Sequence, residues 1–255
     1  MPKLDSDRQG YVNSFMDISI IIPALNEEAK IAHDVATASA FIAGNGFKGE
    51  IIIVDDGSSD QTSTRASSVK VSDSAGVRII RNERRMGKGY SVRRGILASS
   101  GDYVMFADAG NVVPFKCALT GLGMIKAGSC EIAHGSRKTA SSVIVKKSSL
   151  LRRINSIVFN FVTRLVFGLP DWMRDTQCGF KIYKGALARK LYSEAKCNGF
   201  AFDLEVIVLA LKQGVKLGEF PVEWSCDTDT RIHDDLDFSR NFSDLATIFR
   251  LSRRT

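Results

Sequence analysis

The amino-acid sequence predicts an α/β fold whose mostly parallel central sheet is flanked by helices. Short runs rich in β-branched residues, Ile18–Pro23 and Glu50–Val54, predict buried strands. Stretches of helical character follow them, and strand and helix alternate at least four times before residue 115. Such alternation is typical of parallel strands joined by crossover helices.

The elements can be placed in order along the chain. After the strand at 18–23 we expect a helix over 26–41, a strand at 50–54, a turn at 55–60, a short polar helix, a strand at 77–81, a helix over 87–99 and a strand at 102–107. Further on, strands are expected at 131–136 and 216–222, and helices over 148–167, 202–212 and 238–251. Acidic residues in the first turn of the 26–41 helix suit the helix dipole. No linker or repeat interrupts the pattern, so residues 17–255 are predicted to form one domain behind a polar arm at 1–16.

Composition narrows the class of protein. The chain has 255 residues, a net charge of +7 and 44% apolar residues, which is typical of a globular protein with an anion-binding surface. No segment reaches the roughly 18 apolar residues of a membrane span. The basic residues accompany no zinc-finger, helix-turn-helix or RNA-binding pattern, so no nucleic-acid partner is predicted. The cysteines form no CxxC pair and the N-terminus has no apolar segment, so we expect a reducing, cytoplasmic location.

Polar residues follow three of the predicted strands, at 23–27, 55–58 and 108–111. In parallel sheets ligands bind at the carboxyl ends of the strands, so these loops are predicted to converge on one site. A carboxylate at Asp56 can accept hydrogen bonds from a nucleobase or from ribose hydroxyls. Aspartate also suits turns and helix caps, and the residue type alone leaves both interpretations open.

Several ordered motifs carry a family resemblance. They are Ile-Ile-Pro-Ala-Leu-Asn-Glu-Glu at 21–28, Val-Asp-Asp-Gly-Ser-Ser-Asp-Gln-Thr at 54–62, Asn82 with Gly87-Lys-Gly89 and Gly95, Gly135-Ser-Arg137, Asp175–Lys181 and Gly199–Glu205. Together they resemble the family 2 glycosyltransferases of the GT-A fold, in particular the dolichyl-phosphate glucosyltransferase branch and, next, the mannosyltransferases. The likeness covers residues 17 to about 250.

The resemblance implies inverting transfer of a hexose, glucose favoured, from a nucleotide diphosphate sugar to a polyprenyl phosphate. UDP-glucose is favoured over GDP-mannose as the donor. By the same likeness, 17–115 would bind the nucleotide and 116–255 the acceptor. The implied nucleoside contacts are Pro23, Leu25, Glu27 and Asp56; the implied diphosphate and phosphate contacts are Asp108, Ala109, Lys88, Arg137 and Arg231. Asp108 would hold Mg²⁺ or Mn²⁺, and the implied catalytic candidates are Asp108, Asp203, Asp175 and Gln177.

The implied transfer reaction requires residues of these types. Departure of a nucleoside diphosphate builds negative charge, which a cation and arginines stabilise. Asp203 is expected to cap a helix and point into the cleft, whereas Glu205, two residues on, would face elsewhere. Cys178 is predicted to be a buried small residue and not a nucleophile, because no histidine partner is evident.

The sequence departs from the family pattern in two places. The family has Asp-x-Asp where this chain has Asp108-Ala-Gly110, followed by Pro114, so one carboxylate is missing and altered metal dependence is expected. The segment at 226–233, with Asp227 and Asp229, differs from the Gly-Ser-Lys pattern of relatives. Two alternatives remain. The same fold could transfer the sugar to a saccharide or other soluble hydroxyl, for which Asp203 or Asp175 would act as the base. The incomplete Asp-x-Asp also leaves open nucleotide-sugar binding without catalysis.

A polyprenyl phosphate acceptor lies in a bilayer. The helix that begins near Arg152-Arg153 and the basic C-terminal helix combine charge with an apolar face, as helices at anionic lipid surfaces do. Peripheral contact with the cytosolic membrane surface is predicted. The alternative is that both helices pack on the sheet.

Overall fold

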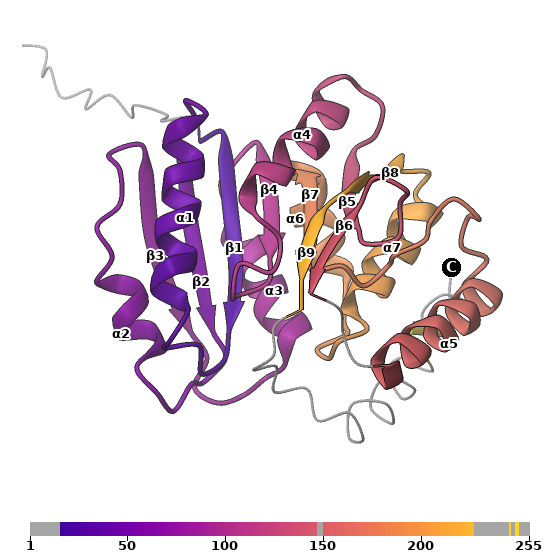
Figure 1. The fold of residues 1–255 in the computed structure, drawn as a ribbon, viewed down its shortest axis with the longest axis horizontal. Helices are drawn as coiled ribbons and strands as arrows, with labels where there is room; N and C mark the ends of the chain where they lie inside the picture. Colours follow the sequence, from indigo (N-terminus) through magenta and orange to yellow (C-terminus); the bar gives the residue numbers. More distant parts are fainter. Residues whose placement is uncertain (1–15, 147–149, 227–244, 246–247, 250–255) are drawn as a thin grey trace, which may run out of the picture.

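A computed structural model describes residues 16–146, 150–226, 245, 248 and 249. A seven-stranded sheet in the order β3-β2-β1-β4-β7-β5-β8 forms its centre (Figure 1). The strands are β1 (Ile18–Ala24), β2 (Gly49–Asp55), β3 (Ala75–Arg81), β4 (Tyr103–Ala107), β5 (Ile132–Ser136), β7 (Phe180–Lys184) and β8 (Leu217–Pro221). All pairings are parallel except those of β7, which runs antiparallel to both β4 and β5. The predicted α/β class with a mostly parallel sheet is confirmed.

Helices cover both faces of this sheet. One face carries α1 (Ile31–Gly44), α2 (Thr62–Ser67), the 3-10 turn η1 (Phe115–Cys117) and α4 (Ala118–Lys126). The other carries α3 (Lys88–Leu97), α6 (Gly185–Glu194) and α7 (Phe202–Lys212). The helix α5 (Leu150–Phe167) lies at the far side of the β5 half of the molecule (Figure 1). The strands β6 (Val143–Lys146) and β9 (Glu223–Ser225) form a second, two-stranded parallel sheet. No helix in the described ranges is long and apolar enough to cross a membrane.

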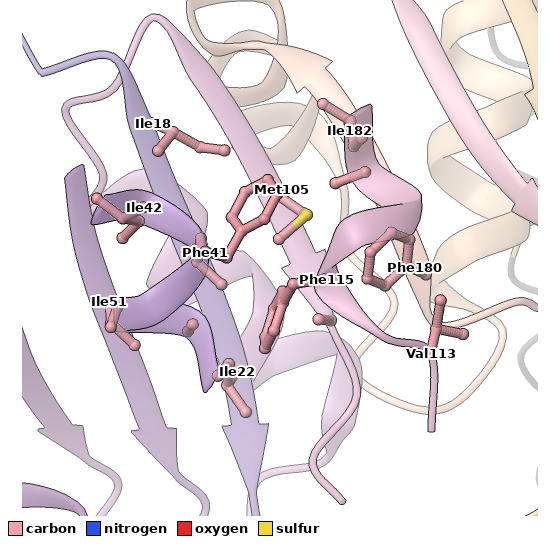
Figure 2. Close-up of a cluster of buried hydrophobic side chains, with 14 of the residues drawn as sticks. Ile18, Ile22, Phe41, Ile42, Ile51, Met105, Val113, Phe115, Phe180 and Ile182 are labelled. Carbon is pink, nitrogen blue, oxygen red and sulfur yellow. The ribbon is translucent and has the colours of Figure 1, made fainter. Parts of the chain in front are cut away.

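The core consists of two apolar layers, one on each face of the sheet. In β1, Ile20 and Ile22 point into the layer under α1 and α4, whereas Ile21 points to the layer under α3. This follows from the two-residue period of a strand. Figure 2 shows the first layer, where Phe41 of α1 and Phe115 of η1 meet above the sheet with ring centroids 6.1 Å apart. Burial on both faces explains why the central strands β1 and β2 are nearly continuous apolar runs.

The first helix begins later than predicted. α1 starts at Ile31, and residues 26–30 form a turn instead of helix. Asn26 has a left-handed backbone with φ of 53°, and the amides of Asn26, Glu27 and Glu28 donate to side chains in the loop after β2. The left-handed backbone at Asn26 is incompatible with a right-handed helix, so the predicted first turn is displaced and α1 begins at Ile31.

The other predicted elements of the first half occur within a few residues of their expected bounds. The elements η1, α4, β6, β7, α6 and β9 were not predicted. The C-terminal helix expected at 238–251 lies largely outside the described residues, although Leu245 and Ile248 are buried in the layer under α3. The polar arm at 1–16 also lies outside them, apart from Met16.

Candidate active site

Asp56 lies at the carboxyl edge of the sheet, directly after β2. Its side chain is 5% exposed and accepts hydrogen bonds from Asn82 Nδ2 at 2.7 Å and from the amides of Met86 at 2.8 Å and Gly87 at 2.9 Å. Both carboxylate oxygens are thus engaged by the loop between β3 and α3. Asp56 fixes the conformation of that loop, which leads to Lys88 at the start of α3.

The neighbouring Asp55 is structural. It is fully buried and accepts hydrogen bonds from the Ser58 amide at 2.7 Å and from the Ser63 hydroxyl, and Arg81 Nη1 lies 3.6 Å away. These are the contacts of an aspartate that stabilises a turn. Of the two interpretations open from the sequence, the turn-forming one therefore holds for Asp55.

The loop after β1 is adjacent to that turn. The Asp56 amide donates to the carbonyl of Ala24 at 2.8 Å, and β1 lies between β2 and β4 in the sheet. The predicted nucleoside contacts in this loop are partly exposed: Pro23, Leu25 and Glu27. The structure thus brings these residues and Asp56 to one edge, as predicted, and their contact with a nucleoside stays a prediction.

Asp108 follows β4, and both its backbone and its side chain have partners in other elements. Its amide donates to the carbonyl of Gly179 at 2.9 Å, and Lys88 Nζ lies 2.7 Å from its Oδ1. A side chain at Gly179 would collide with the Asp108 carboxylate, so glycine allows the carboxylate to lie against the start of β7. The Lys88 ammonium also faces the rings of Phe106 and Phe200, 5.7 and 5.8 Å from their centroids. The ion pair between Lys88 and Asp108 is thus partly exposed, and its ammonium also makes cation–π contacts.

The turn after Asp108 has an unusual backbone. Gly110 and Asn111 have φ values of 89° and 47°, both in the left-handed region. The amide of Gly110 donates to Oδ2 of the buried Asp34, on α1, at 2.8 Å. Ala109 packs against the apolar layer under α1. The glycine in place of the family's second aspartate therefore has a conformational reason, since an aspartate at 110 would have to adopt this strained backbone.

Asp203 forms a buried ion pair with Lys181. Lys181 is fully buried in β7, and its Nζ lies 2.9 Å from Asp203 Oδ1 and donates to the Cys178 carbonyl at 2.8 Å. Burial raises the pKa of Asp203, while Lys181 and Lys88 oppose the shift. Asp203 is not the helix cap that was predicted, because Ala201 takes the N-cap position. Asp203 therefore points at β7 from within the first turn of α7.

Arg137 and Asp175 form a second ion pair. Arg137 Nε and Nη2 donate to the two oxygens of Asp175 at 2.6 and 2.7 Å, a bidentate contact. Burial opposes ionisation of Asp175, but the charge and hydrogen bonds of Arg137 outweigh it and lower the pKa of Asp175 to about 2. The Arg137 guanidinium lies over Trp224, 5.4 Å from the ring centroid. The side chain of Arg137 remains 25% exposed.

The loop that carries Asp175 also contains Gln177 and Cys178. Gln177 is partly buried, and its catalytic role stays a prediction. Cys178 is 1% exposed, and burial raises the pKa of its thiol to about 12, followed by the effect of Asp175. Such a thiol stays protonated at neutral pH, so the prediction of a buried small residue is confirmed.

Sequence reasoning missed residues that act through position. Asp34, Gly179, Lys181 and Trp224 contact the predicted residues without belonging to the predicted set. Gly179 and Lys181 lie in the Asp175–Lys181 motif, which was a usable signal, whereas Asp34 stands in a helix with no motif of its own. The predicted Arg231, with Asp227 and Asp229, lies outside the described residues.

The matches to known proteins agree with this geometry. The chain belongs to glycosyl transferase family 2, whose profile matches residues 19–191. It is 34% identical to a dolichyl-phosphate β-glucosyltransferase of Dictyostelium discoideum over 218 residues, covering 82% of this chain and 66% of the relative. It is 31% identical to the dolichyl-phosphate β-glucosyltransferase of Saccharomyces cerevisiae over 225 residues, covering 81% of this chain and 66% of that one. The chain thus spans about two thirds of the length of these relatives.

A solved structure confirms the fold. Glucosyl-3-phosphoglycerate synthase of Mycobacterium tuberculosis superposes with a TM-score of 0.67 at 21% identity, covering 92% of this chain and 81% of that one. Another structure of that synthase contains Mn²⁺, UDP and phosphoglyceric acid. The GT-A architecture predicted from the motifs is therefore confirmed.

The site can be tested for its fit to a divalent cation. Within the described residues no cluster of three or more histidine, cysteine, aspartate or glutamate side chains gathers around a metal position. The Asp108 carboxylate is paired with Lys88, whose Nζ lies 2.7 Å from Oδ1, so a cation at this position would share the carboxylate with the ammonium. Mg²⁺ and Mn²⁺ accept oxygen ligands, and Mg²⁺ is commonly held by one carboxylate, substrate phosphates and water. Asp108 fits such a site as its one protein carboxylate.

Proposed function

We propose that this chain transfers glucose, with inversion, from a nucleotide diphosphate sugar to a dolichyl or other polyprenyl phosphate. Support comes from the family, from the names of the relatives and from the charges at the carboxyl edge of the sheet. UDP-glucose is the proposed donor, in preference to GDP-mannose. The proposed cofactor is Mg²⁺ or Mn²⁺, held by Asp108 together with the donor's diphosphate, where it would neutralise the charge of the leaving group.

The donor side follows from the fixed positions of Asp56, Asp108 and Lys88. The loop held by Asp56 places Lys88 at the start of α3, and the Lys88 ammonium meets the Asp108 carboxylate within 2.7 Å. In the reaction, the bond between the anomeric carbon and the diphosphate breaks and negative charge grows on the diphosphate oxygens. A fixed ammonium at that point stabilises the developing charge without having to reorganise.

The observation that carries the choice of acceptor is the state of the two candidate bases. A hydroxyl acceptor must lose a proton to a base, whereas a phosphate monoester is already anionic near neutral pH. Asp175 is locked by Arg137 and has a pKa of about 2, which makes it a poor proton acceptor. Asp203 is 4% exposed and paired with Lys181. A phosphate acceptor needs neither of them to take a proton.

The acceptor phosphate is proposed to approach Arg137. Two of its nitrogens contact Asp175 and its plane lies over Trp224, so the guanidinium is held in one orientation. A guanidinium of fixed orientation binds phosphate oxygens with little loss of side-chain entropy. Asp175 and Asp203 then act by holding Arg137 and Lys181 in place.

The membrane partner is proposed to be the cytosolic leaflet, contacted through α5. One face of this helix exposes Ile157 (64%), Phe161 (68%) and Leu165 (76%), one turn apart, whereas Phe159 and Thr163 of the opposite face are buried. Large apolar side chains in a continuous row on the surface mark an interaction site. A lipid surface suits this face because the proposed acceptor lies in a bilayer.

The decisive experiment is a panel of UDP- and GDP-sugars offered with dolichyl or undecaprenyl phosphate, with Mg²⁺, with Mn²⁺ and with a chelator. We expect glucosylated polyprenyl phosphate from UDP-glucose, and slower turnover in the chelator. Transfer to a soluble sugar hydroxyl at an equal or greater rate would contradict the proposal. Binding of UDP or GDP without turnover would indicate a nucleotide-sugar binding protein instead.

A further inference from the structure

Asp34 is a buried carboxylate that no motif predicted. It lies on α1, is 1% exposed and accepts the amide of Gly110 at 2.8 Å, from a residue 76 positions along the chain. The Asn111 amide, one residue further on, also lowers the pKa of this carboxylate. One side chain of α1 therefore accepts a hydrogen bond from the turn that follows Asp108.

The turn needs such support. Gly110 and Asn111 are successive residues with positive φ, and Asn111 is one of two non-glycine residues with positive φ in the described ranges. Successive amides in such a turn point to the same side and form a concavity that binds an anion. Strained backbone of this kind persists only where its surroundings hold it. The Asp34 carboxylate is the anion in this case, supplied by the protein itself.

The surroundings of Asp34 make its charge sensitive to pH. Within the described residues, its Oδ1 has no hydrogen-bond partner, nor has the buried Oδ1 of Asn111. Burial raises the pKa of Asp34 to about 6, against the lowering effects of the Gly110 and Asn111 amides and of the charges of His33 and Lys30. Asp34 is thus ionised at neutral pH and becomes protonated in mild acid.

We propose that Asp34 is a positioning residue, which holds the 108–111 turn so that the Asp108 carboxylate faces the donor's diphosphate. This inference rests on the proposed donor site. Asp34 touches neither the donor nor the cation. It acts because Gly110 and Asn111 belong to the same turn as Asp108, with only Ala109 between them, so a change in their backbone rotates the Asp108 side chain away from its place beside Gly179.

The test compares Asp34→Asn and Asp34→Ala with Glu50→Gln. Glu50 is a matched control, since it is also a buried carboxylate with several donors, Ser19, Ser100 and Arg78, but lies at the opposite edge of the sheet. For Asp34→Ala we expect kcat/KM for the donor to fall about 10- to 100-fold, the range for displaced catalytic groups.

In the wild type, kcat/KM should fall as the pH drops through about 6, because protonation removes an acceptor of the turn amides. Asp34→Asn should lack this step and stay near the low-pH value of the wild type.

The outcomes separate this inference from the proposed function. Thermal melting first establishes that each variant is folded. If the wild type transfers no sugar, the affinity for UDP or GDP with Mn²⁺ is measured instead, and we expect about a tenfold loss in Asp34→Ala relative to Glu50→Gln. Unchanged donor kinetics and affinity in both Asp34 variants would overturn the inference. So would an equal loss in Glu50→Gln, because it would reflect general destabilisation.

Discussion

At the scale of single residues, a small set of close approaches determines the site. Gly179 lets the Asp108 carboxylate lie against the backbone of β7, and the Gly179 carbonyl accepts the Asp108 amide at 2.9 Å. The Lys88 ammonium completes this arrangement from α3. The Asp108 carboxylate can take this position only because residue 179 has no side chain.

Gly179→Ala should therefore impair transfer without unfolding the protein. The added methyl group would collide with the Asp108 carboxylate and rotate it away from Lys88. We expect kcat/KM to fall about 100-fold, as for a misplaced catalytic group. Gly123→Ala is the matched control, since a methyl group there meets no atom within 4 Å and position 123 lies in a helix. Equal activity of the two variants would show that the carboxylate has room to move.

At the scale of elements, α5 differs from the other helices. It exposes a row of large apolar residues, and Trp172 (46%) and Val145 of β6 (70%) are further exposed apolar residues of this half of the chain. Arg152 and Arg153 belong to the first turns of this helix. The described part of the C-terminal segment behaves differently, because Leu245 and Ile248 are buried and Phe249 packs against Phe167. These residues therefore pack on the protein, as the alternative interpretation predicts, and are not exposed as residues of a lipid-facing helix would be.

Membrane binding should depend on the exposed face of α5. The double variant Phe161→Glu with Leu165→Glu is expected to reduce cosedimentation with anionic liposomes at least tenfold, because burying each apolar side chain contributes about 1.5–3 kcal/mol. Leu119→Glu serves as the control, since Leu119 is a 45% exposed residue of α4. Wild-type protein that does not sediment with anionic liposomes at all would rule out the proposed contact.

At the scale of the whole molecule, the sequence predicts the first half of the fold better than the second. Strands such as Ile18–Ala24 lie between two helical layers, so their apolar runs are unmistakable. β7 was missed because Lys181 and Lys184 interrupt its apolar pattern, and Lys181 is tolerated inside only because Asp203 pairs with it. The site residues at strand ends were predictable from topology and motifs. Asp34 was not, because its role depends on a turn 76 residues away.

Global stability should depend on pH through His134. This residue of β5 is 1% exposed, and burial, followed by the charge of Lys181, holds the pKa of its imidazole well below 6.5. Below about pH 6.5 the unfolded chain therefore binds a proton at His134 that the folded state does not bind. The free energy of unfolding is highest above that pH and decreases as the pH falls. Asp34 has the opposite effect between about pH 6 and 4, because its folded-state pKa is raised.

The contribution of His134 can be isolated by comparing variants in urea unfolding at pH 7 and pH 5. The wild type should lose stability relative to His134→Gln by up to about 1.4 kcal/mol for each pH unit below 6.5. His33→Gln, at an exposed position of α1, controls for the loss of an imidazole outside the core. An identical pH dependence in His134→Gln and the wild type would contradict this assignment.

The antiparallel strand β7 also has a mechanical consequence. Its hydrogen-bonded ladders to β4 and β5 lie inside the sheet and join the strands of the first half of the chain to those of the second. A hinge motion between the two halves would have to break these hydrogen bonds. We therefore expect no opening of the sheet of the kind seen in two-lobed enzymes. In the proposed transfer reaction, substrate entry and product release would rely on the loops at the carboxyl edge, and the motion of those loops would set the turnover rate.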